Sequence, residues 1–375
     1  MLTCIIKGTT GCNLSCTYCS VGKKEVPRYA TPEMLTASFL YIGALCRRRG
    51  EKHANVIFHG GEPTLLSPDS YQTAISAAQN AYPELIWDFL MQTNGYMLHE
   101  DWLYFLKKSG VRVGVSIDGG QSIHDQTRRD PQNRPTFQRV VHNIDAMLER
   151  EIPVSCLMVL TRAALNQPLD YLHFFAERRL SLKINPLLRC GEACEHPNLF
   201  LKDGEYADYL IRCFSYRLKQ KLDLTIAPID TIVSAILTGE PVHECTFSAG
   251  CNTNFLCIDY KGDIYPCGKF ADLHDYRLGS IHDMKFDPLD CPSMKELMSR
   301  RTVALPSKCT KCQYLNLCHA GCNAEALMSN GLEQPSALCS DYRALFDFAT
   351  SEGLTLLRTA LLQRKNELSE ALHGI

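Results

Sequence analysis

Short apolar runs alternate with helix-forming segments six times between the first residue and about residue 222. The runs that predict strands are residues 2–7, 55–59, 85–92, 111–117, 153–160 and 181–187. They are rich in aliphatic and β-branched residues and show little alternation, which is typical of buried parallel strands. Six strand–helix units predict an α/β fold, a partial (βα)6 barrel of the TIM type. An open doubly wound sheet is the alternative.

Helix boundaries between these runs follow known cap signals. Thr31 and Ser67 each precede a proline, as a cap residue does when proline occupies the first helical position. Gly50 and Gly110 stand where the helices that follow the first and third strands should end.

The overall composition excludes several classes of protein. A length of 375 residues predicts two structural units, and 45% apolar with 21% charged residues predicts a globular chain. The formal net charge of -2 favours neither nucleic acid nor an anionic membrane as a partner. No secretion signal and no run of 18 apolar residues is present, so we expect a cytoplasmic protein. In the reducing cytoplasm, metal ligation explains 19 cysteines better than disulfides do.

The strand–helix pattern ends near Pro228. Ten cysteines follow from Cys245 to Cys339 among turn residues, and eight of them form the pattern described below. Two apolar runs within residues 255–265 flank a Lys-Gly turn and predict a β-hairpin. A helical pattern closes the chain from about residue 343 to 372. We therefore predict three parts: a barrel at 1–235, a cysteine-rich domain at 240–345 and a C-terminal helix at 346–375.

Three cysteines, Cys12, Cys16 and Cys19, form a Cx3Cx2C motif directly after the first predicted strand. Iron-sulfur clusters normally take four thiolates, so three at close spacing leave one iron of a cubane open to a ligand. A zinc site with a distant fourth ligand, or structural thiols, are the alternatives.

Polar and glycine-rich motifs follow the next three predicted strands. They are Gly60-Gly61-Glu62-Pro63, Gln92-Thr93-Asn94-Gly95 and Ser116-Ile117-Asp118-Gly119. Each motif alone is typical of an ordinary turn. Active sites of barrels lie at the carboxyl ends of the strands, so together these motifs predict a pocket on one rim.

With its Cx3CxΦC motif, Gly-Gly-Glu-Pro segment and Ser-Ile-Asp-Gly segment, the chain resembles the radical S-adenosylmethionine (SAM) superfamily. The resemblance implies that the open iron of a [4Fe-4S] cluster is chelated by the amino and carboxylate groups of SAM. It also implies a set of SAM-binding residues: Gly60, Gly61 and Glu62 near the ammonium group, Ser116 and Asp118 on the methionine or ribose, Arg128 on the carboxylate, and Tyr18 with Leu187 beside the adenine.

The later cysteines form the pattern Cys309-x2-Cys312-x5-Cys318-x3-Cys322, followed by Cys339 and preceded by Cys251-x10-Gly262-x4-Cys267. In isolation the CxxC pair indicates a zinc ribbon. The whole pattern resembles the SPASM extension of radical SAM peptide-modifying enzymes, which implies two auxiliary [4Fe-4S] clusters and three clusters in all. The implied ligands are Cys245, Cys251, Cys267 and Cys322 for the first, with Cys257 as the alternative to Cys245, and Cys309, Cys312, Cys318 and Cys339 for the second.

The chain is most similar in pattern to short SPASM enzymes, namely ribosomal-peptide maturases and anaerobic sulfatase-maturating enzymes. This resemblance implies an anaerobic oxidoreductase that cleaves SAM reductively, with an electron from a flavodoxin- or ferredoxin-type reductant, and then abstracts hydrogen from its substrate. Sulfatase maturases carry an aspartate after the cysteine of Tyr-Pro-Cys, but here Gly268 follows Tyr265-Pro266-Cys267. That difference counts against sulfatase maturation.

We therefore expect an enzyme that oxidises a short ribosomal precursor peptide and forms an intrapeptide crosslink of the cyclophane or thioether type. The alternatives are an epimerase with Cys190 or Cys257 as hydrogen donor, a sulfatase maturase, a small-molecule dehydrogenase and a non-catalytic zinc-binding scaffold. The chain begins almost at its first strand, so we expect a leader peptide to bind the barrel or a separate recognition protein. No catalytic base is identified by the sequence.

Overall fold

The computed structural model describes residues 1–22, 26–271 and 273–373, with side chains described to residue 363. The chain divides into two compact units, each built from separated segments. The first unit comprises Met1–Leu157, Leu188–Asn198 and Ala249–Leu305, and the second comprises Met158–Leu187, Leu199–Ser248 and Pro306–Ile375. These units divide the chain differently from the three predicted domains, whose limits stay a prediction; their last residues, 374 and 375, lie outside the described residues.

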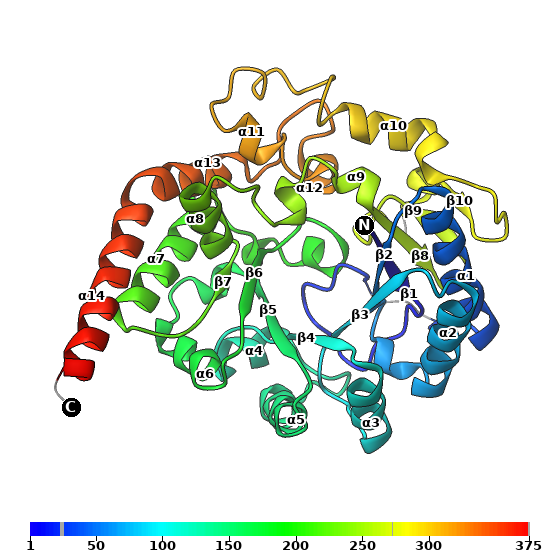
Figure 1. Ribbon diagram of the computed structural model, residues 1–375, viewed down its shortest axis with the longest axis horizontal. Helices are drawn as coiled ribbons and strands as arrows, with labels where there is room; N and C mark the ends of the chain where they lie inside the picture. Colours follow the sequence, from blue (N-terminus) through cyan, green and yellow to red (C-terminus); the bar gives the residue numbers. More distant parts are fainter. Residues whose placement is uncertain (23–25, 272, 374–375) are drawn as a thin grey trace. The chain divides into compact units, whose positions relative to one another are not determined.

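In the first unit the strands follow the order β10-β9-β8-β1-β2-β3-β4-β5 (Figure 1). In the second unit the last residues of β5 are followed in the sheet order by β6 and then β7. The strands are β1 Leu2–Lys7, β2 His53–His59, β3 Ile86–Thr93, β4 Arg112–Ser116, β5 Val154–Leu160, β6 Leu182–Pro186, β7 Ile226–Ala227, β8 Phe255–Asp259, β9 Asp263–Tyr265 and β10 Gly279–Ser280. The first six reproduce the predicted strands within two residues at each end. The predicted α/β fold class with its parallel strands and cysteine-rich C-terminal region is confirmed.

Helices connect the strands. The α-helices are α1 Pro32–Arg48, α2 Pro68–Ala81, α3 Glu100–Ser109, α4 Gln121–Thr127, α5 Phe137–Glu149, α6 Leu172–Glu177, α7 Glu205–Lys219, α8 Ile229–Thr238, α9 Cys251–Asn254, α10 Pro292–Ser299, α11 Leu315–Cys318, α12 Asn323–Ser329, α13 Cys339–Phe348 and α14 Leu354–His373. Short 3-10 segments include η1 Pro63–Leu65, η4 Gly191–Glu195 and η6 Cys245–Phe247, and the π-helical turn η9 Ala349–Gly353 joins α13 to α14.

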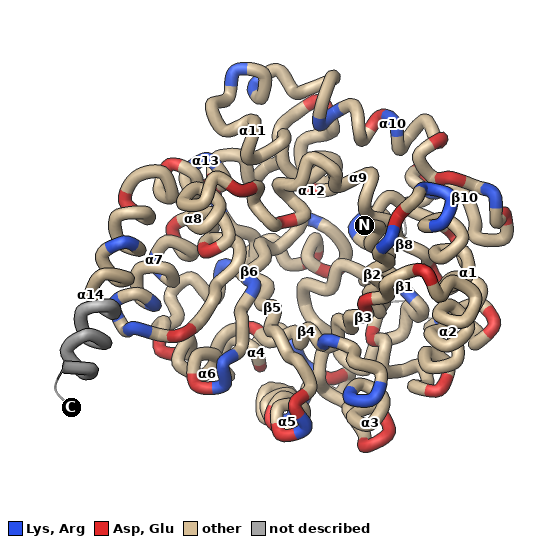
Figure 2. The backbone as a smooth tube through the Cα atoms, viewed as in Figure 1, with Lys and Arg blue, Asp and Glu red and all other residues tan. Residues whose placement is uncertain are grey.

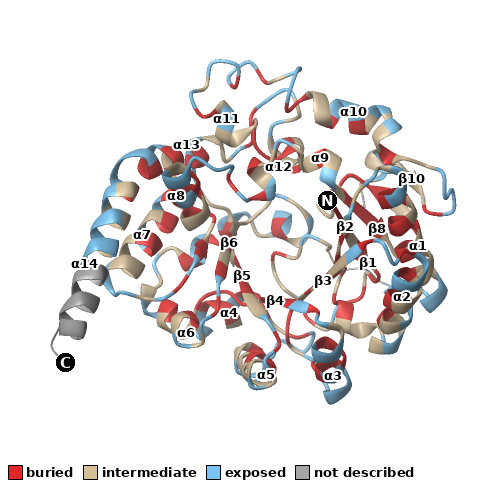
Figure 3. Cartoon of the chain, in the orientation of Figure 1, coloured by how far each residue is buried: buried red, intermediate tan, exposed pale blue. Residues whose placement is uncertain are grey.

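The predicted hairpin is present as β8 and β9, and it extends the sheet of the first unit. Strand β8 runs parallel to β1, in a register from Thr3 opposite Phe255 to Lys7 opposite Asp259. Its three central residues are buried (Figure 3). The sequence analysis assigned this hairpin to a separate cysteine-rich domain. Its pairing with β1 was not predictable, because it depends on contacts between residues that are distant in the sequence.

The two faces of β1 and its neighbours have different roles. On one face Phe58 of β2 packs against Phe39 of α1 and Tyr71 of α2, with ring centroids 6.0 and 4.5 Å apart. Side chains alternate across a strand, so Ile5 and Lys7 of β1 point to the opposite face and are half-buried. That opposite face carries the polar strand ends of the candidate site.

The predicted caps of the first two helices are confirmed. The hydroxyl of Thr31 accepts a hydrogen bond from the backbone N–H of Met34, and that of Ser67 accepts one from Ser70, both at 3.2 Å. Such a cap typically stabilises a helix by about 1 kcal/mol. Gly110 ends α3 with a φ of 64°, as predicted.

In the second unit, α7, α8 and α13 pack together around aromatic side chains. Phe214 of α7 meets Phe348 of α13 edge to face, with ring centroids 5.7 Å apart. The buried carboxylate of Asp341 accepts hydrogen bonds from Gly204 N and Ala207 N and so caps the start of α7. The predicted C-terminal helix is thus two helices, α13 and α14, with a π turn between them.

Basic and acidic residues are interspersed along the chain (Figure 2). Within the described residues no helix is both long and apolar enough to cross a membrane.

Candidate active site

Cys12, Cys16 and Cys19 lie on the loop that leaves the carboxyl end of β1, in the first unit. Cys12 is exposed and the other two are half-buried. The loop is held by backbone hydrogen bonds from Ser15 N to Arg129 O, 2.7 Å, and from Thr17 N to Thr127 O, 3.0 Å. The three thiols lie close enough to influence one another electrostatically. The predicted ligand set is therefore gathered on one anchored loop.

The glycine pair after β2 allows this loop to approach closely. Gly61 N and Glu62 N donate hydrogen bonds to Thr9 O and Gly11 O, each at 2.8 Å. A β-carbon at residue 61 would lie 2.0 Å from Gly11 O, and one at residue 60 would lie 2.4 Å from Thr9 O. The sequence predicted that these glycines let a ligand approach the backbone. In the structure they let the backbone of the cluster loop approach, because a β-carbon at either position would clash with it.

Glu62 is buried and its carboxylate is fully engaged by neighbouring strand ends. Oε1 accepts hydrogen bonds from Thr93 Oγ1 at 2.6 Å and Thr64 Oγ1 at 2.8 Å, and Oε2 accepts one from Asn94 N at 2.7 Å. Burial raises the pKa of this carboxyl, and the hydrogen bonds oppose the shift. These contacts support a role for Glu62 in orienting the loops that follow β2 and β3.

Asn94 links this carboxylate to the cluster loop, a contact that the sequence did not assign. Its Nδ2 donates to Asn13 Oδ1 at 2.7 Å and approaches Cys12 Sγ at 3.6 Å. The backbone N–H of Leu14 also donates to Cys12 Sγ at 3.4 Å. Hydrogen bonds to a ligand sulfur tune the potential of an iron-sulfur cluster.

Tyr18, Asp118 and Arg128 form a buried network beside Cys16. The hydroxyl of Tyr18 donates to Asp118 Oδ2 and accepts from Arg128 Nη1 at 2.7 Å. Thr127 Oγ1 also donates to Asp118 Oδ2, at 3.1 Å. Burial raises the pKa of the Cys16 thiol to about 11, although Arg128 opposes the shift. The sequence placed these three residues around SAM but did not predict that they bond to one another.

His124 positions Arg128 through a chain of hydrogen bonds. Its Nδ1 accepts from Asp118 N at 3.3 Å, and its Nε2 lies 3.1 Å from Thr136 Oγ1. Thr136 Oγ1 in turn donates to Arg128 O at 2.6 Å. Burial, with a smaller contribution from Arg128, lowers the pKa of His124, so this ring stays neutral.

The residues present fit a cluster with bound SAM. The buried Nε of Arg128 has no hydrogen-bond partner among the described residues, which leaves a cationic donor for a carboxylate. Ser116 Oγ accepts from Gln92 Nε2 at 3.0 Å and is half-buried. Leu187, the weaker candidate for the adenine, is half-buried just beyond β6 in the second unit. The assignments of individual residues to parts of SAM stay predictions.

Replacement of Arg128 by glutamine is expected to weaken SAM binding at least about ten-fold, since a hydrogen bond to a charged group contributes roughly 1.5–3 kcal/mol. Equilibrium dialysis of labelled SAM with cluster-loaded enzyme measures the change. Arg129→Gln is the matched control, because among the described residues the Arg129 side chain hydrogen-bonds only to the Asn133 carbonyl, in an exposed contact. Unchanged affinity with intact iron content would contradict the role given to Arg128.

The cysteines predicted for the first auxiliary cluster are divided between the units. Cys251 and Cys267 belong to the first unit, at the start of α9 and just after β9, whereas Cys245 and Cys322 belong to the second. Cys257, the alternative to Cys245, is fully buried in β8, where its thiol lies near Cys4. This ligand set stays a prediction.

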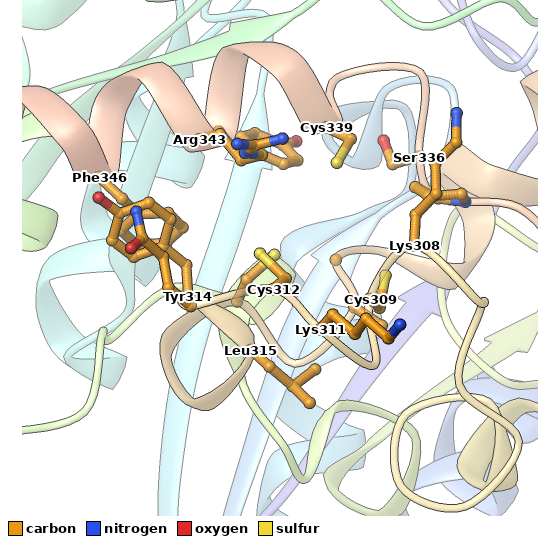
Figure 4. Close-up of a pocket in the computed structure, with 16 residues that line it drawn as sticks. Lys308, Cys309, Lys311, Cys312, Tyr314, Leu315, Ser336, Cys339, Arg343 and Phe346 are labelled. Carbon is orange, nitrogen blue, oxygen red and sulfur yellow. The ribbon is translucent and has the colours of Figure 1, made fainter.

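The cysteines predicted for the second auxiliary cluster line one cavity in the second unit. Cys309, Cys312, Cys318 and Cys339 surround a space of about 370 Å³. The Cys339 sulfur, on α13, faces the loop that carries Cys309 and Cys312 (Figure 4). Burial raises the pKa of the Cys339 thiol, and Arg343 and Lys308 oppose the shift. In the described residues, no three histidine, cysteine, aspartate or glutamate side chains are grouped closely enough to hold a single metal ion. The cavity nevertheless has room for an iron-sulfur cluster.

Cys339→Ala is expected to remove about four iron atoms per chain and leave SAM binding unchanged. Iron and sulfide analysis of the reconstituted protein measures the loss. Cys213→Ala is the control, since Cys213 is a buried thiol of α7 in the same unit. Equal iron content in both variants would exclude Cys339 as a cluster ligand.

The remaining cysteines are not among the predicted cluster ligands. Cys4, Cys46, Cys156 and Cys213 are buried, and Cys291 is half-buried with its thiol 3.3 Å from Leu278 O. Cys190 directly precedes the short helix η4 in the first unit, and Cys194 lies within it. That segment contacts the cluster loop, because Glu192 N donates to Cys19 O at 3.0 Å.

Comparison with known proteins agrees with this geometry. Residues 6–174 match the family model of the Radical SAM superfamily, so this part of the chain is a radical SAM domain. The protein is therefore an enzyme that carries a radical SAM domain.

Its similarity to particular relatives extends over nearly the whole chain. The cysteine-type anaerobic sulfatase-maturating enzyme of Clostridium novyi is 26% identical, over 97% of this chain and 99% of the relative. The serine-type anaerobic sulfatase-maturating enzyme of Bacteroides thetaiotaomicron is 25% identical, over 89% and 86%.

Solved structures show the same fold. Native anSMEcpe with bound AdoMet and Kp18Cys peptide has a TM-score of 0.80 at 25% identity, over 96% of this chain and 99% of that chain. SuiB of Streptococcus suis bound to S-adenosylmethionine has a TM-score of 0.63 at 17% identity, over 90% and 77%. The likeness to SuiB shows the fold alone.

Proposed function

We propose that this enzyme abstracts hydrogen from a peptide and completes a two-electron oxidation that forms a crosslink within that peptide. The observation that carries the hydrogen abstraction is the loop with three thiols held beside the unpartnered Nε of Arg128. The peptide substrate is supported by the likeness to anSMEcpe, whose structure is described with a bound peptide.

When bound, a cluster and SAM at this site would supply the radical chemistry that removes one hydrogen atom from the peptide. The second hydrogen would leave as a proton, and its electron would pass to a one-electron acceptor, a role open to a cluster held by Cys309, Cys312, Cys318 and Cys339. The chain supplies orientation. Glu62 fixes the ends of β2 and β3 against each other, and Asn94 approaches a ligand sulfur. Tyr18 and Asp118 hold Arg128 in place.

Gly268 supports crosslinking over sulfatase maturation, because the carboxylate that sulfatase maturases carry at this place is absent. Sulfatase maturation is the second candidate, supported by similarity to those enzymes over 97% of the chain. The two products differ chemically. Oxidation of a serine or cysteine side chain without a new bond between residues leaves a carbonyl or thiocarbonyl group, whereas a crosslink does not.

High-resolution mass spectrometry of the peptide encoded beside this gene, co-expressed anaerobically with the enzyme, tests the proposal. We expect loss of two hydrogens and no reaction of the product with hydroxylamine. A product that reacts with hydroxylamine would favour the sulfatase-maturase activity. An unchanged mass would contradict peptide oxidation for that substrate.

A further inference from the structure

Lys7 is a half-buried cation at the carboxyl end of β1, one strand end away from the glycine pair. Among the described residues its ammonium group forms no hydrogen bond and no ion pair. Its register partners do not neutralise it. Asp259 accepts hydrogen bonds from Lys261 N and Asp263 N in its own hairpin turn, at 2.8 and 2.9 Å. Burial, together with Lys7, lowers the pKa of His59 to about 4, so His59 is neutral.

Gly268 explains why Lys7 lacks a counter-ion. A β-carbon at residue 268 would lie 3.9 Å from Lys7 Cε and 3.2 Å from Ile5 Cδ1. An aspartate at this position would therefore reach the ammonium group of Lys7. Glycine instead leaves Lys7 without a neighbouring carboxylate, on the face of the sheet that carries the strand ends of the site.

The surroundings of Lys7 add positive charge and place it near the cluster loop. Lys7 and Lys269 both act on the Cys190 thiol, whose pKa burial raises and the two lysines lower. The next residue, Gly191, packs on the cluster loop: its β-carbon would lie 2.2 Å from Cys19 O. All of these residues belong to the first unit.

We infer that Lys7 binds a carboxylate of the peptide substrate, so the enzyme selects a peptide with an acidic residue close to the modified position. The inference rests on the proposed function and names the substrate class of the same site. A half-buried cation without a counter-ion is costly, and an anion that approaches it gains a charge-assisted hydrogen bond. Replacing that anion by an isosteric amide forfeits the gain.

The test uses fluorescent short peptides in pairs, identical except for glutamate or glutamine beside a central cysteine or serine. Anisotropy titrations are made anaerobically with cluster-loaded enzyme and SAM. The wild type is expected to bind the glutamate peptide at least about ten-fold more tightly. Lys7→Gln and Gly268→Asp should abolish this preference, the first by removing the cation and the second by neutralising it. Lys7→Glu should prefer a peptide with lysine at the variable position.

Lys108→Gln is the matched control, because Lys108 is exposed on α3 and should leave the preference unchanged. Equal binding of both peptides by the wild type, including weak binding of both, overturns the inference. A preference that survives Lys7→Gln overturns it too, as does a Lys7→Gln variant that loses affinity for SAM instead. Failure of the proposed function is seen separately, as an unchanged mass of a peptide that binds.

Discussion

Replacing Cys12, Cys16 and Cys19 together by alanine is expected to abolish formation of 5′-deoxyadenosine and to remove about four iron atoms per chain. The three thiols are the predicted ligands gathered on the loop after β1, and without them we expect no cluster to bind SAM there. The measurement is chromatography of dithionite-reduced reactions, beside iron analysis of the same preparations.

The control is Cys291→Ala, a half-buried thiol of the same unit that bonds to a backbone carbonyl. It should retain all of the iron and the wild-type rate. Full iron content in the triple variant would contradict the assignment, as would continued cleavage of SAM. Loss of iron in Cys291→Ala would mean that any cysteine replacement disturbs the protein.

Gly61→Ala is expected to be nearly as damaging, although it changes no ligand. The added β-carbon would meet Gly11 O at 2.0 Å, and neither backbone can move without breaking the hydrogen bonds from Gly61 N and Glu62 N. Overpacking of this kind costs roughly 1–3 kcal/mol of folding free energy. We therefore expect a lower melting temperature and a loss of the cluster that the neighbouring loop holds.

Gly50→Ala separates this clash from the general cost of replacing a glycine. Gly50 has a φ of 66°, and its β-carbon would meet nothing within 4 Å. It should lose about 1 kcal/mol of stability and keep its iron. Similar iron content in both variants would show that close contact at Gly61 does not support the cluster loop.

The strands were predictable from the sequence, because buried parallel strands leave continuous apolar runs. The cluster loop was predictable because Cys12, Cys16 and Cys19 are close in the chain. The neighbour of β1 was not predictable, since Phe255 and Thr3 meet across 252 residues of sequence separation.

The same distinction applies within the site. Arg128 and Tyr18 were predicted separately as SAM-binding residues, but their bond joins residues 110 positions apart. The engagement of Glu62 with Thr93 and Asn94 likewise depends on the packing of two strand ends. A motif shows which polar side chains are present. Which residues they hydrogen-bond to depends on the fold.

Gly268 illustrates how a single departure from the sulfatase-maturase pattern gains meaning from the structure. In the sequence, Gly268 stands at the position where sulfatase maturases carry an aspartate. In the structure a β-carbon at this position would lie 3.9 Å from Lys7 Cε, so an aspartate there would neutralise Lys7 and glycine does not. The departure therefore bears on which peptide binds as well as on which product forms.

The measurement that tests the central claim most directly is transfer of deuterium from the peptide to 5′-deoxyadenosine. A peptide deuterated at its modified residue is incubated anaerobically with the enzyme, SAM and a one-electron reductant. We predict that the 5′-deoxyadenosine carries deuterium and that the peptide loses it together with a second hydrogen. Unlabelled 5′-deoxyadenosine, formed while the peptide keeps all of its deuterium, would contradict the claim that this enzyme abstracts hydrogen from a peptide.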